Sequence, residues 1–252
     1  MNDANMQNIK FELGLVMAGA ISAGAYTAGV IDFLLQALDE WQRMKEDGIK
    51  CPPHEVTIRV MSGASAGGMT AAITAAMLNG VFSPVDNLAN GEIPPDNPLY
   101  NSWVRDIDIK PLMGTYDLRD HKQIVSLLDS SILDKIAKNA IRFTPYGKRR
   151  PYIDENLHLY LTLTNLRGIP YRIAFQGEAG FGHEIALHAD NLYFISGDSD
   201  PKIQGGLWLD STNPNNCGWE KLAQAALATG AFPVGLTPRI LSRPSTDYES
   251  IN

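Results

Sequence analysis

A serine framed by two glycines stands where an apolar strand passes directly into an alanine-rich helix. Residues 56–62 place apolar side chains on alternate positions, and residues 67–79 read as a helix that ends before Gly80. Between them, Gly63-Ala64-Ser65-Ala66-Gly67 follows the pattern Gly-x-Ser-x-Gly. A side chain at either glycine would crowd the strand and helix in so sharp a turn. The sequence therefore predicts a strand, a tight turn and a helix, with Ser65 at the turn.

This setting points to nucleophilic chemistry. A strand-to-helix turn of this kind presents the serine hydroxyl above the edge of a sheet. The N–H of Ala66 would lie at the helix N-terminus, where it can stabilise negative charge on a carbonyl oxygen. We therefore predict Ser65 as a nucleophile, with Gly63 and Gly67 shaping the turn. The alternative is a turn of small residues without chemistry.

A second small-residue turn joins the first expected strand, 11–17, to a helix at 26–41. The strand carries apolar residues on both faces, which suits a central position, and Ser22 is placed to cap the helix. Small residues around Gly19, Ala20 and Ile21 allow the backbone to approach a ligand. A phosphate site is disfavoured because neither Gly-x-Gly-x-x-Gly nor Gly-Lys-Ser/Thr occurs there. Plain packing of helix on sheet is the other alternative.

Strands that alternate with helices predict one α/β domain. With 252 residues and 44% hydrophobic residues, the chain can bury a substantial core. We expect residues 1–10 to be extended or disordered and 11–252 to form a three-layer sandwich around a central, mostly parallel sheet. The remaining expectations are a surface excursion over 81–116, helices at 121–128, 131–142 and 219–228, and strands at 157–165 and 171–175.

The net charge and the N-terminal sequence limit which binding partners and which cellular location we expect. A net charge of -7 disfavours nucleic acid, and residues 1–10 lack the features of a secretory signal, so a cytoplasmic location is expected. Two cysteines are too few for a disulfide framework or a zinc site. One basic stretch could contact anionic lipid at a membrane surface, although an ordinary solvated helix face is the alternative. It comprises Lys135, Lys138, Arg142, Lys148, Arg149 and Arg150.

Taken together, four landmarks in this order resemble the patatin-like phospholipases. They are the glycine-rich segment 13–30, the elbow 63–67, the strand 161–166 and the helix with its stop at 225–233. The resemblance implies a lipid acyl hydrolase whose Ser65 works with an Asp, without histidine, metal or cofactor. It also implies an oxyanion hole built from Gly19, Ala20, Ile21 and Ala66.

The chain departs from this family at two places. Ala20 and Ala23 stand where the family has glycines or a basic residue. In the family, the catalytic Asp lies in an Asp-Gly-Gly or Asp-Gly-Ala that follows the Phe-Pro pair, here Phe232-Pro233, at which the helix stops. This chain has no such motif after Pro233, so we expect the catalytic Asp beyond Asn252. Within the chain, Asp210 is the best substitute, although it precedes the stop.

Two other functions stay open. An α/β-hydrolase triad would combine Ser65 with Asp117 or Asp120 and with one of His158, His183 and His188. That fold places several strands before its nucleophile, whereas one clear strand precedes Ser65. The missing Asp also allows a catalytically inactive module that binds lipid or a protein partner.

Overall fold

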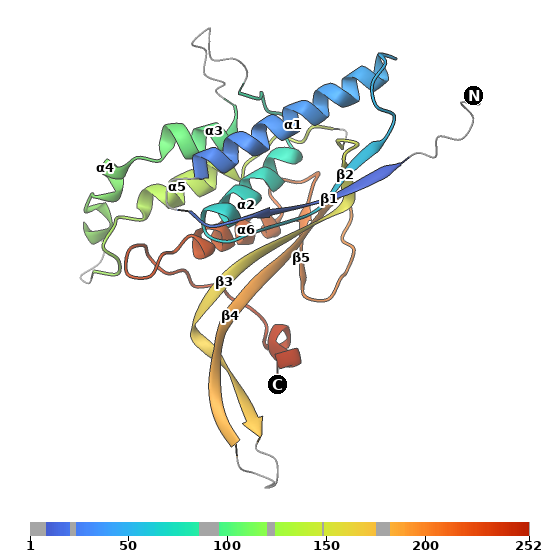
Figure 1. Ribbon diagram of the computed structural model, residues 1–252. Helices are drawn as coiled ribbons and strands as arrows, with labels where there is room; N and C mark the ends of the chain where they lie inside the picture. Colours follow the sequence, from blue (N-terminus) through green and yellow to red (C-terminus); the bar gives the residue numbers. More distant parts are fainter. Residues whose placement is uncertain are drawn as a thin grey trace.

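A computed structural model of the chain describes residues 9–20, 24–85, 96–119, 124–147, 149–174 and 182–251 (Figure 1). Five strands form one sheet in the order β1-β2-β3-β4-β5. β1, β2 and β3 run parallel, β4 is antiparallel to β3, and β5 is parallel to β4. The strands are β1 Lys10–Met17, β2 Glu55–Gly63, β3 Ile153–Ala174, β4 Gly182–Gly197 and β5 Gly206–Asp210.

Two helices contact the sheet directly, and other helices pack on these two. α2 and α6 contact the strands directly, α1 and α3 pack on α2, and α5 packs on α6. Every residue of α2 except Met69 is buried, which explains why this helix is apolar on all sides. The helical elements are α1 Gly24–Glu46, α2 Ala66–Leu78, α3 Pro98–Tyr100, the π-helix η3 Asn101–Asp106, α4 Ile109–Leu112, the 3-10 helix η4 Tyr116–Arg119, α5 Ser131–Ala140, α6 Cys217–Thr229 and the 3-10 helix η5 Ser245–Ile251.

The predicted fold class is confirmed. The chain is an α/β protein with a mostly parallel sheet and packed helices, consistent with a three-layer sandwich. The first two strands, the long first helix, the alanine-rich helix and the helices at 131–142 and 219–228 all form close to their predicted bounds. The predicted cap Ser22 and residues 1–8 lie outside the described residues.

Three expectations about the sheet need correction. The strands predicted at 157–165 and 171–175 belong to one long strand, β3, whose pairing with β4 is irregular between Thr164 and Ile169. Sequence patterns did not reveal β4 and β5. β1 lies at the sheet edge, not in the centre, and its Val16 side chain is 83% exposed.

Two loop expectations also need correction. The segment 81–116 is not only a surface excursion, because it contains α3 and η3 and buries Leu99 and Asn97. The amide of Asn97 donates a 2.6 Å hydrogen bond to buried Asp32 of α1, which fixes this segment against the core. In the range predicted as a helix at 121–128, the described residues 124–128 are not helical.

Candidate active site

Ser65 stands at the junction of β2 and α2 in a backbone conformation that L-residues rarely adopt. Its φ is 52° and its ψ is -124°. Such a conformation costs of order 1–3 kcal/mol and persists where the surrounding structure holds it. Although Ser65 is the N-cap of α2, its side chain makes no capping hydrogen bond. The half-buried hydroxyl is therefore not engaged in holding the helix.

The two flanking glycines are required by close backbone contacts. A Cβ at Gly63 would lie 2.4 Å from the carbonyl carbon of Gly67, and a Cβ at Gly67 would lie 2.1 Å from the carbonyl oxygen of Met17. Both contacts are far inside van der Waals distance, and both involve backbone. The Gly-x-Ser-x-Gly pattern thus reflects tight packing of the turn against the end of β1.

The glycine-rich turn after β1 lies directly against the nucleophile. A Cβ at Gly19 would be 3.1 Å from the Cβ of Ser65, and Gly19 is exposed. The N–H of Ala66, the first residue of α2, has no intrahelical acceptor and can donate to a ligand. Ala20 is half-buried beside this turn, whereas the predicted donor Ile21 lies outside the described residues.

A threonine that the sequence did not single out holds the turn from the other side. The N–H of Ser65 donates to Oγ1 of Thr229 over 2.8 Å, and that hydroxyl donates in turn to the carbonyl oxygen of Thr162 over 2.7 Å. The segments 161–166 and 225–233, noted as separate landmarks, therefore meet at the serine. Their appearance in one ordered set was the signal available in the sequence.

We expect Thr229→Val to lower the free energy of unfolding by about 1–3 kcal/mol, because the half-buried N–H of Ser65 loses its acceptor. Thr229→Ser keeps the hydroxyl and is the matched control. Urea unfolding followed by circular dichroism measures both. Equal stability of the two variants would show that this hydrogen bond does not hold the turn.

Asp210, predicted as a base within the chain, lies near the opposite end of the strands from Ser65. Gly63 pairs with Leu161 and Leu161 with Leu192, whereas Asp210 pairs with Gly197, five residues further along β4. At about 3.3 Å per residue, this separates Asp210 from the turn by at least ~16 Å along the strands. Its carboxylate instead accepts hydrogen bonds from the N–H and hydroxyl of Thr212. The prediction for Asp210 is wrong.

The histidines proposed for a triad are engaged elsewhere. His158 alternates with core-facing residues of β3, so its ring lies on the sheet face opposite α2, where Nδ1 is 2.6 Å from the hydroxyl of Tyr193. Burial and neighbouring Tyr160 raise the pKa of Tyr193 to about 12, so the phenol stays protonated. His188 Nδ1 lies 2.7 Å from the carbonyl oxygen of Asn165.

The other residues proposed for a triad are His183, Asp117 and Asp120. His183 pairs with Ile173 in the part of the β3–β4 hairpin that projects from the body (Figure 1). The N–H of Asp117 donates a long hydrogen bond of 3.4 Å to the carboxylate of Asp129. Asp120 lies outside the described residues. No hydrogen bond recorded among the described residues joins Ser65 to a histidine or carboxylate.

The basic stretch divides into exposed and structural residues. Lys135, Lys138 and Arg142 are exposed on or just after α5, and Lys148 lies outside the described residues. The predicted membrane contact is wrong for Arg150, which is buried and donates to the carbonyl oxygens of Leu78 and Gly80 at the end of α2. Arg149 likewise donates to the carbonyl oxygens of Asp154 and Ser196.

Replacing Arg150 with methionine is expected to lower the free energy of unfolding by about 1.5–3 kcal/mol. The change leaves two helix-end carbonyl groups without their charged donor. Lys138→Met, on the exposed side of α5, is the matched control and should stay within about 0.5 kcal/mol of the parent. Guanidinium unfolding curves decide between a structural and a surface role for Arg150.

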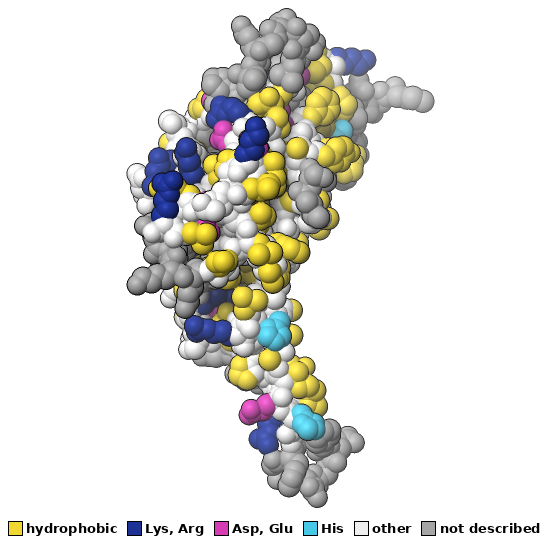
Figure 2. Space-filling model, turned by 90° about the vertical axis from the view of Figure 1, so that its left-hand side faces the viewer, with side chains coloured by type: hydrophobic (Ala, Val, Ile, Leu, Met, Phe, Trp, Pro, Cys, Tyr) yellow, Lys and Arg dark blue, Asp and Glu magenta, His cyan; other side chains and the backbone are white. Residues whose placement is uncertain are grey.

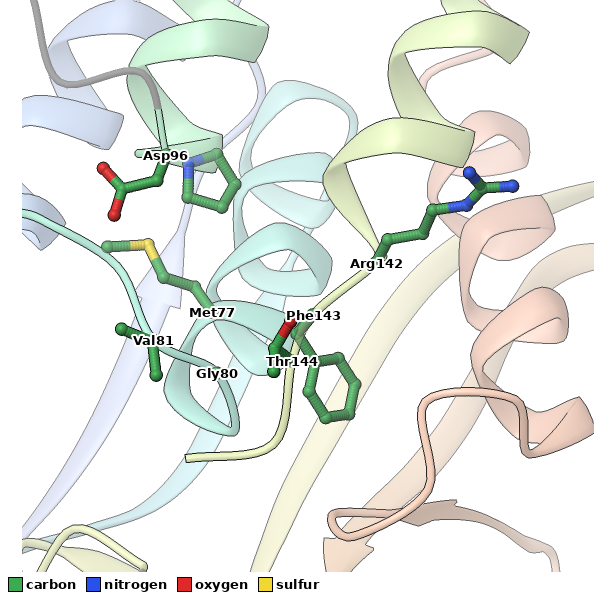
Figure 3. A pocket seen from close by; sticks show the side chains of 8 residues that line it. Met77, Gly80, Val81, Asp96, Arg142, Phe143 and Thr144 are labelled. Carbon is green, nitrogen blue, oxygen red and sulfur yellow. The ribbon is translucent and has the colours of Figure 1, made fainter. Parts of the chain in front are cut away.

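A hollow of about 270 Å³ lies at the far end of α2 from the serine. Met77 and Gly80 line one side and Phe143 and Thr144 another, while the guanidinium of Arg142 points away from Asp96 (Figure 3). Met77 follows Ser65 by twelve positions, which at a helical rise of 1.5 Å per residue is about 18 Å. This hollow is not part of the site at the turn.

The fold and the turn together define an α/β protein with an elbow-like serine. The chain is 35% identical to the uncharacterized protein y4iI of Sinorhizobium fredii over 275 aligned residues, which cover 94% of this chain. The chain spans 38% of the length of that relative. No family model and no solved structure matches the chain. Among the described residues, no helix combines the length and the hydropathy that crossing a bilayer requires.

Proposed function

We propose that this chain carries the nucleophile and the oxyanion hole of a serine hydrolase that cleaves acyl esters of lipids, like the patatin-like phospholipases it resembles. The observation that carries the proposal is the backbone of Ser65. Its φ of 52° at a strand-to-helix junction, with the hydroxyl not used as a cap, is the arrangement of a nucleophile elbow.

In the proposed reaction, Oγ of Ser65 attacks the ester carbonyl carbon while its proton passes to a carboxylate base. The carbonyl oxygen becomes an oxyanion, which the N–H of Ala66 and the backbone around Gly19 stabilise. Collapse of this intermediate releases the alcohol and leaves an acyl ester on Ser65, and water then releases the fatty acid. Each oxyanion donor contributes roughly 10²- to 10³-fold in rate at comparable sites.

We propose that the base is an Asp supplied from outside these 252 residues. Two observations support this. No hydrogen bond among the described residues links Ser65 to a carboxylate, and Asp210 lies near the opposite end of the strands. The relative y4iI is also much longer than this chain. We also propose that the enzyme is cytoplasmic and meets its substrate at a membrane surface.

A fluorophosphonate probe tests the function directly. Oγ of Ser65 displaces fluoride from phosphorus, and the resulting adduct is located by mass spectrometry of the digested protein. We expect the adduct on Ser65, formed faster in the full-length natural protein than in the 252-residue chain because the base is then present. An adduct on another residue contradicts Ser65 as the nucleophile. No adduct in either protein contradicts a serine hydrolase and leaves an inactive binding module.

A further inference from the structure

Five apolar side chains stand out from two loops beside the proposed nucleophile. They are between 52% and 74% exposed, so each presents half or more of its surface to solvent. The largest exposed apolar patch on a monomeric protein is often functional. The five residues, called here the apolar rim, are Ile124, Val125, Leu127, Phe232 and Val234.

Backbone hydrogen bonds fasten the two loops of the apolar rim to each other. The N–H of Leu127 donates to the carbonyl oxygen of Val234 over 2.9 Å, and the N–H of Leu128 donates to that of Gly235 over 3.0 Å. The hydroxyls of Ser126 and Thr237 lie 2.8 Å apart beneath them. The polar groups are thus paired within the protein while the apolar side chains face outward.

The backbone of Val234 shows that its outward position is held against an intrinsic preference. Its φ is 68°, a region that is a genuine outlier for a β-branched residue, and its side chain is 73% exposed. Strain of this kind persists when the surrounding contacts impose it, and it clusters at functional sites. Here the turn closed by the hydrogen bond from the N–H of Leu236 to the carbonyl oxygen of Phe232 imposes it.

One loop of the apolar rim begins next to the candidate active site. Phe232 follows Thr229 by three residues, and Thr229 accepts the hydrogen bond from the N–H of Ser65. Figure 2 looks onto the edge of the molecule where β1 and β2 end, and hydrophobic side chains run down this face with Lys and Arg side chains along one flank. A ligand bound at the apolar rim would therefore lie beside the nucleophile.

The charge around the apolar rim has the opposite sign to that of the whole chain, which is -7. The described residues between Lys110 and Arg142 hold three acidic groups: Asp117 is half-buried, Asp129 is buried and hydrogen-bonded, and Asp134 is paired with Arg239 at 2.6 Å. Five basic side chains there are exposed, which leaves a cationic border that complements anionic headgroups. They are Lys110, Arg119, Lys135, Lys138 and Arg142.

We propose that the apolar rim docks the protein on a bilayer that contains anionic lipid, with the rim side chains in the acyl region and the cationic border at the headgroups. The choice of lipid over a protein partner rests on the proposed function. Docking in this orientation places Ser65 at the bilayer surface, where an ester can reach it without full extraction of the lipid into water.

Flotation with vesicles of 70% phosphatidylcholine and 30% phosphatidylglycerol tests the docking without reference to catalysis. The variant Leu127→Ser/Phe232→Ser is expected to lower the vesicle-bound fraction at least about tenfold. The matched control Ile49→Ser/Val81→Ser changes exposed apolar residues outside the apolar rim and should bind within about twofold of the parent. Val234→Asn is a further test, because asparagine tolerates a positive φ and keeps the loop folded.

Three results would overturn the proposed docking on a bilayer. Absence of vesicle binding by the parent, or equal binding by the Leu127→Ser/Phe232→Ser and control variants, overturns it. A parent that is dimeric by sedimentation equilibrium and becomes monomeric in the Leu127→Ser/Phe232→Ser variant also overturns it, since the apolar rim is then an interface between copies. Ser65→Ala should float like the parent. If the parent floats but its Ser65 is not labelled by the fluorophosphonate, only the proposed function is rejected.

Discussion

Replacement of Ser65 with alanine abolishes covalent labelling by fluorophosphonates and lowers ester hydrolysis on the order of 10³-fold or more, if the hydroxyl is the nucleophile. Among the described neighbours of Ser65, Gly19, Ala64 and Ala66 offer only backbone. The hydroxyl of Thr229 is already engaged with the N–H of Ser65 and the carbonyl oxygen of Thr162. Since the side chain of Ser65 makes no capping hydrogen bond, the substitution removes chemistry without removing a helix cap.

The matched control is Ser62→Ala, which removes a half-buried hydroxyl from β2, three residues before Ser65. Labelling of this variant should equal that of the parent. Rates are measured with the full-length natural protein, using a short-chain chromogenic ester that does not require a membrane. Persistence of hydrolysis in Ser65→Ala within tenfold of the parent would show that the activity belongs to another residue.

The candidate site was predictable where local geometry determines it. A glycine pair around a serine, between an apolar strand and a small-residue helix, requires the contacts seen between Gly63 and Gly67 and between Gly67 and Met17. The contact between Gly19 and Ser65 followed in the same way from two successive strand-to-helix turns, which parallel pairing brings to one edge.

Long-range contacts were less accessible to sequence patterns. Thr229 reaches Ser65 across 164 positions of the chain, and no local periodicity encodes such a hydrogen bond. The position of Asp210 depends on the direction of β4 and β5, neither of which was predicted. Arg150 looked like a surface charge because three basic residues in a row usually are, yet its burial against the end of α2 is a tertiary effect.

Placing a methyl group on Gly67 is expected to destabilise the protein by about 3 kcal/mol or more, or to prevent folding. The new Cβ would lie 2.1 Å from the carbonyl oxygen of Met17 and 2.6 Å from that of Ala18, and both are backbone atoms at the end of β1. Relief requires β1 and α2 to separate, which would disturb the turn that holds Ser65. Thermal unfolding and the yield of folded protein measure the loss.

Gly29→Ala is the control that separates this contact from a general effect of replacing glycine. Gly29 lies inside α1, and a Cβ there would meet nothing within 4 Å, so alanine should raise the free energy of unfolding by about 0.5–1 kcal/mol. The two variants add the same methyl group and should shift stability in opposite directions. If Gly67→Ala were as stable as the parent, the close approach of α2 to β1 would be wrong, and with it the placement of the oxyanion turn beside Ser65.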